Sequence, residues 1–234
     1  MAEGPSGERR PWRDEIAVAL IAFGAGATDA LSFVALGQVF TSAMTGNAVL
    51  LGLAIGQGRI AAAGRSVAAL TGFLAGGAVA CRPLVSAPRG TWSRGVVAGF
   101  AIEAGFLALF ALLLITAGHD GDALQTILIL LAAAGMGAQS VVARHLNIPG
   151  ITTTVFTGTL IDIVYTLSGA AARPAESRLV PYHTAREMLA FAIYTAGAAA
   201  GGGLSLLHAW LAGLVPLAAV LVAVLIRPTS RLST

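Results

Sequence analysis

Charge is scarce in this sequence, lysine is absent, and cysteine occurs once. Only 11% of the 234 residues are charged, against roughly 25% in soluble domains, which excludes a soluble globular protein. The 14 basic residues are all arginines, and apart from the Arg9–Arg10 pair they stand singly, so the continuous basic face of a nucleic-acid binder is excluded as well. A lone cysteine, Cys81, excludes an internal disulfide and a cysteine-based metal site.

Apolar residues dominate what remains. They make up 56% of the chain, and the mean hydropathy is +0.82, which predicts an all-α integral membrane protein with the lipid bilayer as its main surroundings. Six segments are predicted to be full transmembrane helices: Ile16 to Leu36, Ser66 to Val85, Gly95 to Ala117, Ala123 to Ala143, Met188 to Leu207 and Trp210 to Ile226. Two further apolar segments have threonines near their start and are either short tilted spans or re-entrant half-helices: Thr41 to Ile55 and Ile151 to about Ala171.

The chain repeats itself loosely. The stretch GAGATDALSFVALGQVFTSAMTGN at 24–47 returns 111 residues later as GMGAQSVVARHLNIPGITTTVFTGT at 135–159. A second match is independent of the first, because an arginine precedes a glycine by 11 residues at Arg65 and Gly76 and again at Arg186 and Gly197. These matches predict one membrane domain of two internal repeats, 16–118 and 123–226, between cytoplasmic tails at 1–15 and 227–234.

The arginines predict the orientation in the membrane. If all eight segments cross, ten arginines fall on the side of the N-terminus and four on the other; if the two threonine-led segments re-enter, the split becomes 12 to two. Both counts place the N- and C-termini in the cytoplasm. The sharper split favours six spans plus two re-entrant segments, which would relate the two repeats by inverted topology, whereas eight spans would make them parallel.

Two segments of the sequence carry a resemblance to a known family. The segments GATDALSFVALGQVFTSAMTGNAVLLG and AAAGMGAQSVVARHLNIPGITTTVFTGTLIDI resemble the YoaK family, a group of bacterial inner-membrane proteins catalogued as a domain of unknown function. The resemblance covers nearly the whole chain. It implies a multi-pass protein of the bacterial inner membrane, and it brings no catalytic residues with it.

Three acidic residues lie inside apolar segments: Asp29, Glu103 and Asp162. A charge at the centre of a membrane costs about 2.5–3.5 kcal/mol on insertion scales, so such residues commonly face a cavity and mark an ion or proton path. The alternative is that these carboxyl groups are protonated or hydrogen-bonded to neighbouring helices and only fix their packing.

The threonine-led segments suggest a complementary feature. If helices begin there inside the membrane, their free N–H groups form weakly positive sites beside hydroxyl side chains, although hydroxyls bonded one turn back within a continuous helix would look the same in the sequence. With the acidic residues they give the expected set of residues that bind a solute or ion: Asp29, Thr45, Gly46, Asn47, Glu103, Gln139, Thr157, Gly158, Thr159 and Asp162.

The sequence therefore predicts a small transporter or channel for a polar or ionic solute, with its site between the repeats. The alternative is a membrane scaffold or partner subunit that transports nothing. No nucleophile with a nearby base is recognisable, so we expect no enzyme and no cofactor. The four histidines have no metal-ligand spacing, so no metal site is expected, and a homo-oligomer is left open.

Overall fold

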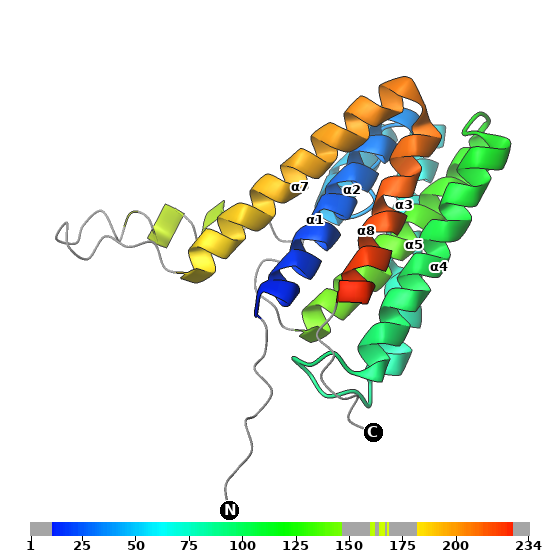
Figure 1. Ribbon diagram of the computed structural model, residues 1–234. Helices are drawn as coiled ribbons and strands as arrows, with labels where there is room; N and C mark the ends of the chain where they lie inside the picture. The colour runs from blue at the N-terminus through cyan, green and yellow to red at the C-terminus, as the bar shows by residue number, and fades with distance from the viewer. Residues whose placement is uncertain (1–10, 147–159, 162–163, 167, 169–181, 227–234) are drawn as a thin grey trace, which may run out of the picture.

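The computed structural model describes residues 11–146, 160–161, 164–166, 168 and 182–226, and within that part of the chain every regular element is a helix (Figure 1). Six helices are long and apolar enough to cross a membrane, and one more is apolar but shorter, as predicted. The elements are α1 (Pro11–Ala35), α2 (Met44–Gly56), α3 (Ile60–Cys81), a 3₁₀ turn (Arg82–Leu84), α4 (Arg94–Ala117), α5 (Asp122–Leu146), α7 (Tyr182–Leu207) and α8 (Ala209–Ile226).

Several helices begin elsewhere than predicted. Helix α1 begins at Pro11, inside the predicted tail, because proline at the first helical position has a suitable φ angle and needs no N–H partner. Helix α3 begins at Ile60 rather than Ser66, since the intervening alanines are strong helix formers. Helix α7 likewise begins six residues early, at Tyr182.

Helices α1 and α7 pack closely enough that only glycine fits between them. A Cβ atom at Gly26 would lie 2.0 Å from the carbonyl oxygen of Tyr194, and one at Gly197 would lie 2.1 Å from that of Phe23. Gly201 faces the backbone of Ala27 in the same way. Residue numbers rise together along both helices, so α1 and α7 run parallel.

A second pair, α3 and α5, packs in the same manner. A Cβ atom at Gly76 would lie 1.9 Å from the carbonyl oxygen of Ala134, and one at Gly137 would lie 2.0 Å from that of Phe73. Gly72 faces Leu130 as Gly76 faces Ala134, so residue numbers rise together and this pair is also parallel. Helices α4 and α8 complete the bundle by packing against α5 and α1 respectively and against each other. Close contact between backbones supplies the van der Waals attraction that joins helices in lipid, where the hydrophobic effect does not.

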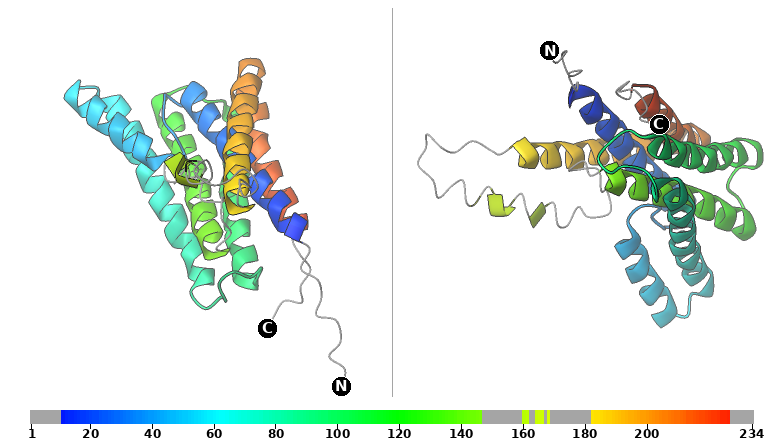
Figure 2. Two further views of the ribbon diagram at one scale, coloured as in Figure 1. Left: turned by 90° about the vertical axis from the view of Figure 1, so that its left-hand side faces the viewer. Right: turned by 90° about the horizontal axis from the view of Figure 1, so that it is seen from below.

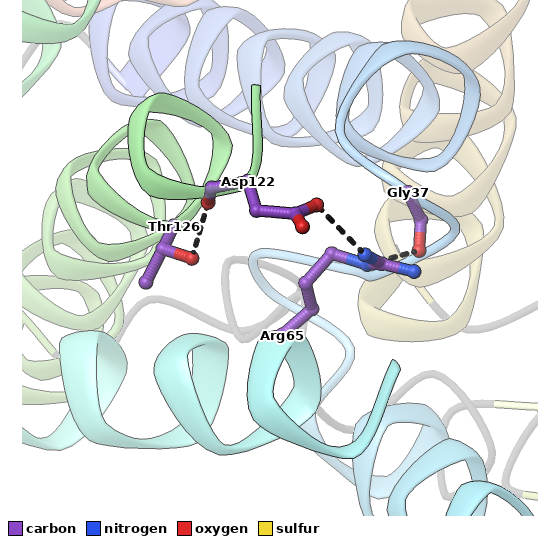
Figure 3. A network of polar contacts seen from close by, with 4 residues as sticks. All are labelled: Gly37, Arg65, Asp122 and Thr126. Atoms are coloured by element: carbon purple, nitrogen blue, oxygen red, sulfur yellow. Dashed lines mark hydrogen bonds and ion pairs between the residues drawn. The ribbon is translucent and has the colours of Figure 1, made fainter. Parts of the chain in front are cut away.

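One end of the bundle gathers the end of α1 and the beginnings of α3 and α5; we call it the Arg65 end. There Nε of Arg65 donates a hydrogen bond to the Gly37 carbonyl at 3.3 Å, while its NH1 nitrogen lies 3.9 Å from Oδ1 of Asp122 (Figure 3). Glycines with positive φ at Gly118 and Gly121 make the turn from α4 to α5 at the same end.

The opposite end joins the α3–α4 connection to the end of α5; we call it the His145 end. The Gly90 amide donates to the His145 carbonyl at 3.1 Å, and Nε2 of His145 lies 3.2 Å from the carbonyl oxygen of Pro88. Because α7 runs parallel to α1, it begins here and α8 ends here.

The short helix α2 stays on one side of the protein. It connects the end of α1 to the beginning of α3, and both lie at the Arg65 end, so α2 does not cross. Figure 2 shows α2 at the edge of the bundle beside α3. Helix α5 ends and α7 begins at the His145 end; the predicted segment from Ile151 to about Ala171, which lies between them, falls largely outside the described residues.

Candidate functional site

Asp29 lies in α1, six residues before the helix ends at Ala35, and its side chain is 2% exposed. The connection from α1 to α2 folds back to this depth, about 9 Å below the end of α1 at 1.5 Å per residue. The carboxylate oxygen Oδ1 accepts hydrogen bonds from the Thr41 amide at 2.6 Å, the Thr41 hydroxyl at 2.9 Å and the Ser42 amide at 2.8 Å. The re-entrant connection is thus hydrogen-bonded to the side of α1 through Asp29.

The second carboxylate oxygen joins a third element to this cluster. Oδ2 of Asp29 accepts from the Ser42 hydroxyl at 2.5 Å and from the Tyr194 hydroxyl of α7 at 2.6 Å. All five groups donate, so the carboxylate serves only as an acceptor, and five donors occupy its roughly four lone-pair positions. We call Asp29, Thr41, Ser42 and Tyr194 the Asp29 cluster.

The Asp29 cluster also accounts for the beginning of α2. The amides of Thr41 and Ser42 point to Asp29, so the helix begins at Met44 rather than at the predicted Thr41. Its N-cap, Ala43, provides no side-chain hydrogen bond. A negative charge near a helix N-terminus is stabilising, so the positive end of α2 expected inside the membrane is matched by a carboxylate of the same chain.

Asn47 is fully buried and closes the connection onto itself. Its Oδ1 accepts from the Phe40 amide at 2.9 Å, and its Nδ2 donates to the Phe40 carbonyl at 2.6 Å. Gly46 lies under the Phe40 ring, which stacks on Phe33 at 5.2 Å between centroids. Thr45 is exposed on α2. These three predicted site residues therefore lie in or beside the connection, and they are separate from the Asp29 carboxylate.

Glu103 and Gln139 lie deeper in the bundle. Glu103 in α4 is 2% exposed, and its Oε2 has no hydrogen-bond partner among the described residues. The Gln139 amide of α5 donates to the Ile21 carbonyl of α1 at 2.9 Å. Asp29 stands eight residues along α1 from Ile21, about 12 Å, so Asp29 and Gln139 lie at different depths.

The remaining predicted site residues, Thr157, Gly158, Thr159 and Asp162, fall outside the described residues. Sequence analysis does not single out Tyr194. The one signal for it is a tyrosine that follows the apolar run from Met188 to Ile193, because the hydroxyl of a buried tyrosine must find a partner. Within the described part of the chain, no three His, Cys, Asp or Glu side chains are grouped so that they could hold a metal ion.

Comparison with known proteins adds a family. Residues 17–226 match the family described as "Protein of unknown function (DUF1275)". The chain is also 35% identical over 181 residues to the UPF0700 transmembrane protein YoaK of Bacillus subtilis (strain 168), an alignment that covers 77% of this chain and 79% of the relative. No solved structure matches it.

Proposed function

The chain belongs to the DUF1275 family of transmembrane proteins of unknown function, and from this premise we propose that it is a small transporter or channel for a polar or ionic solute. The observation that carries the proposal is the re-entrant connection held inside the bundle by the buried carboxylate of Asp29. Irregular backbone is tolerated at membrane depth only where it is buried in protein or lines a path for water. Such breaks form the solute sites of many transporters.

We further propose that the two halves are repeats, and the packing of glycines supports this. Gly26 faces Tyr194, and Gly137 faces Phe73. The two glycines are 111 residues apart, and their partners are 121 residues apart. The first helix of each half would thus meet the third helix of the other half through equivalent residues.

A second pair of contacts has the same spacings. Gly197 faces Phe23, and Gly76 faces Ala134; here too the residues on α1 and α5 differ by 111 and those on α3 and α7 by 121. Helix α1 ends at the Arg65 end, where α5 begins. The repeats would accordingly have inverted topology, an arrangement common in secondary transporters, whose sites lie between the repeats.

The distribution of arginines supports an orientation. Among the described residues the Arg65 end has Arg59 and Arg65, whereas the His145 end has six arginines: Arg13, Arg82, Arg89, Arg94, Arg144 and Arg186. Positively charged loops remain in the cytoplasm. We place the His145 end, and with it both termini, in the cytoplasm of a bacterial cell whose inner membrane contains the protein.

One observation favours the second candidate, a non-transporting scaffold or partner subunit. The Asp29 carboxylate is already occupied by five donors of its own chain, as a purely structural carboxylate would be. A transporter would have to exchange some of these hydrogen bonds for solute contacts during its cycle. Neither candidate requires catalysis, and we propose no enzymatic activity and no cofactor.

Thermal unfolding of the purified protein against ions, amino acids, sugars, nucleobases and organic acids tests the proposal. A ligand present at 100 times its dissociation constant adds about 2.7 kcal/mol to the free energy of unfolding. The variant Asp29→Asn should lose the shift. The matched control is Asp122→Asn, which makes the same chemical change at a side chain that is 88% exposed and should retain it.

Compounds that stabilise the protein are then tested for flux into liposomes. Uptake by the wild type that disappears in Asp29→Asn and persists in Asp122→Asn is the expected result. If no compound shifts the unfolding temperature, and Asp29→Asn only lowers it, the scaffold is the better description. Affinity purification should then recover a defined protein partner.

A further inference from the structure

Glu103 is a buried acidic residue that does not belong to the Asp29 cluster. It stands nine residues after Arg94, where α4 begins, and 14 residues before Ala117, where it ends. At 1.5 Å per residue these separations are about 14 Å and 21 Å, which places Glu103 well inside the hydrocarbon region. Its side chain is 2% exposed, so the carboxyl group reaches neither lipid headgroups nor bulk water.

The register between α4 and α5 identifies what lies level with Glu103. Gly99 faces Val142, and Gly135 faces Leu107, so the two helices are antiparallel and Glu103 falls at the level of Gln139 and the residue before it. The Gln139 amide nitrogen already donates to the Ile21 carbonyl. The Oε2 atom of Glu103 has no hydrogen-bond partner among the described residues.

Among the residues that the structure describes, no charged side chain of a neighbouring element compensates Glu103 from close by. Helix α8 has no titratable residue, and Arg144 of α5, about 8 Å further along the axis from the level of Glu103, is exposed on the outside. The other titratable or charged groups on α4 and the elements packed against it lie towards helix ends: Arg65, Cys81, Arg82, Arg94, Asp122, Arg144 and His145.

We propose that Glu103 is a proton-binding site, occupied by a proton in this conformation. An ionised carboxylate without a partner or water costs far more than a neutral carboxylic acid at the same place. A metal cation is the poorer ligand, because hard cations such as Ca²⁺ need six to eight oxygen ligands and no cluster of acidic groups surrounds Glu103 in the described part of the chain.

The proton site adds a coupling ion to the proposed transport function, and this role of the proton rests on that proposal. If the protein transports a solute, the proton on Glu103 is its coupling ion, released when the packing of α4 against α5 changes. Proton binding itself does not depend on transport and can be measured on the protein at rest.

Infrared spectroscopy of the full-length protein in lipid bilayers tests the site. We expect the wild type at neutral pH to show the carbonyl-stretching absorption of an un-ionised carboxyl group. The absorption should disappear in Glu103→Gln, which preserves the shape of the side chain, and remain in Asp29→Asn. Incorporation of glutamate labelled with ¹³C at the side-chain carboxyl should shift the wild-type absorption, whereas labelled aspartate should not, and this measurement needs no variant.

The proposal is overturned if the wild type lacks the absorption, or if labelled glutamate leaves it unshifted. Either result leaves the transport proposal to its own flux assays. Conversely, if Glu103 is protonated but the protein moves no solute in liposomes, the proton site is supported and the transport proposal is contradicted.

Discussion

The hydroxyl of Tyr194 in α7 donates a 2.6 Å hydrogen bond to Oδ2 of Asp29 in α1, although the two residues are 165 positions apart in the chain. Asp29 also binds the connection that leads to α2. One carboxylate therefore holds α1, the re-entrant connection and α7 together. Measuring how much this hydrogen bond contributes to the free energy of unfolding tests the structural role of the Asp29 cluster.

Replacement of Tyr194 by phenylalanine removes the hydroxyl, and with it this hydrogen bond, while the aromatic ring remains. Hydrogen bonds to charged groups contribute about 1.5–3 kcal/mol, so Tyr194→Phe should lower the free energy of unfolding by that amount in reversible denaturation of the detergent-solubilised protein. The control is Tyr165→Phe, because Tyr165 is 82% exposed and its change should stay within about 0.5 kcal/mol. Equal effects of the two substitutions would contradict the structural contribution of the contact.

The glycine contacts predict matched effects in the two halves. Gly26→Ala would place a methyl group 2.0 Å from the Tyr194 carbonyl oxygen, and Gly137→Ala would place one 2.0 Å from that of Phe73. Because these neighbours are backbone atoms, each substitution should destabilise the protein by about 1–3 kcal/mol, the usual cost of overpacking. Gly202→Ala is the control, since nothing lies within 4 Å of the position that its methyl group would take. A cost in one half only would argue against the repeats.

The helices could be predicted from the sequence far better than the site. Long apolar runs identify the six helices that are long enough to cross a membrane, and the turn between α4 and α5 is readable from its glycines. The start of α2 could not be predicted, because the amides of Thr41 and Ser42 are bound by a carboxylate 12 and 13 residues earlier.

Long-range partners are the other part that sequence reasoning misses. Asp29 is recognisable as a carboxylate in an apolar run, but nothing in one sequence pairs it with Tyr194 in a helix at the far end of the chain. Hydrophobic patterns give the length of a helix and say little about which neighbour it meets. Glycines in the sequence mark where another helix can approach closely, but the partner helix is known only from the structure.

Asn47 should be required for the shape of the connection. Its side chain satisfies both backbone groups of Phe40, so Asn47→Ala leaves an amide and a carbonyl unpaired, at a cost of about 1–3 kcal/mol for each buried group. The exposed neighbour Thr45 provides the control, and Thr45→Ala should change the free energy of unfolding by no more than about 0.5 kcal/mol. Equal stability of Asn47→Ala and the wild type in the same denaturation experiment would contradict this assignment.

The path of α2 predicts which residues are accessible from each side of the membrane. In a Cys81→Ser background, single cysteines at Gln57 and Ala87 report on the two ends of α3, of which the first lies at the Arg65 end and the second at the His145 end. With the N-terminus in the cytoplasm, a membrane-impermeant maleimide added to intact cells should label Gln57→Cys and leave Ala87→Cys unlabelled until the cells are opened. If α2 crossed the membrane, α3 would run in the opposite direction and the labelling would be reversed. A fluorescent protein fused to the N-terminus fixes the reference side, so the comparison decides between a re-entrant and a crossing α2 whichever way the protein is inserted.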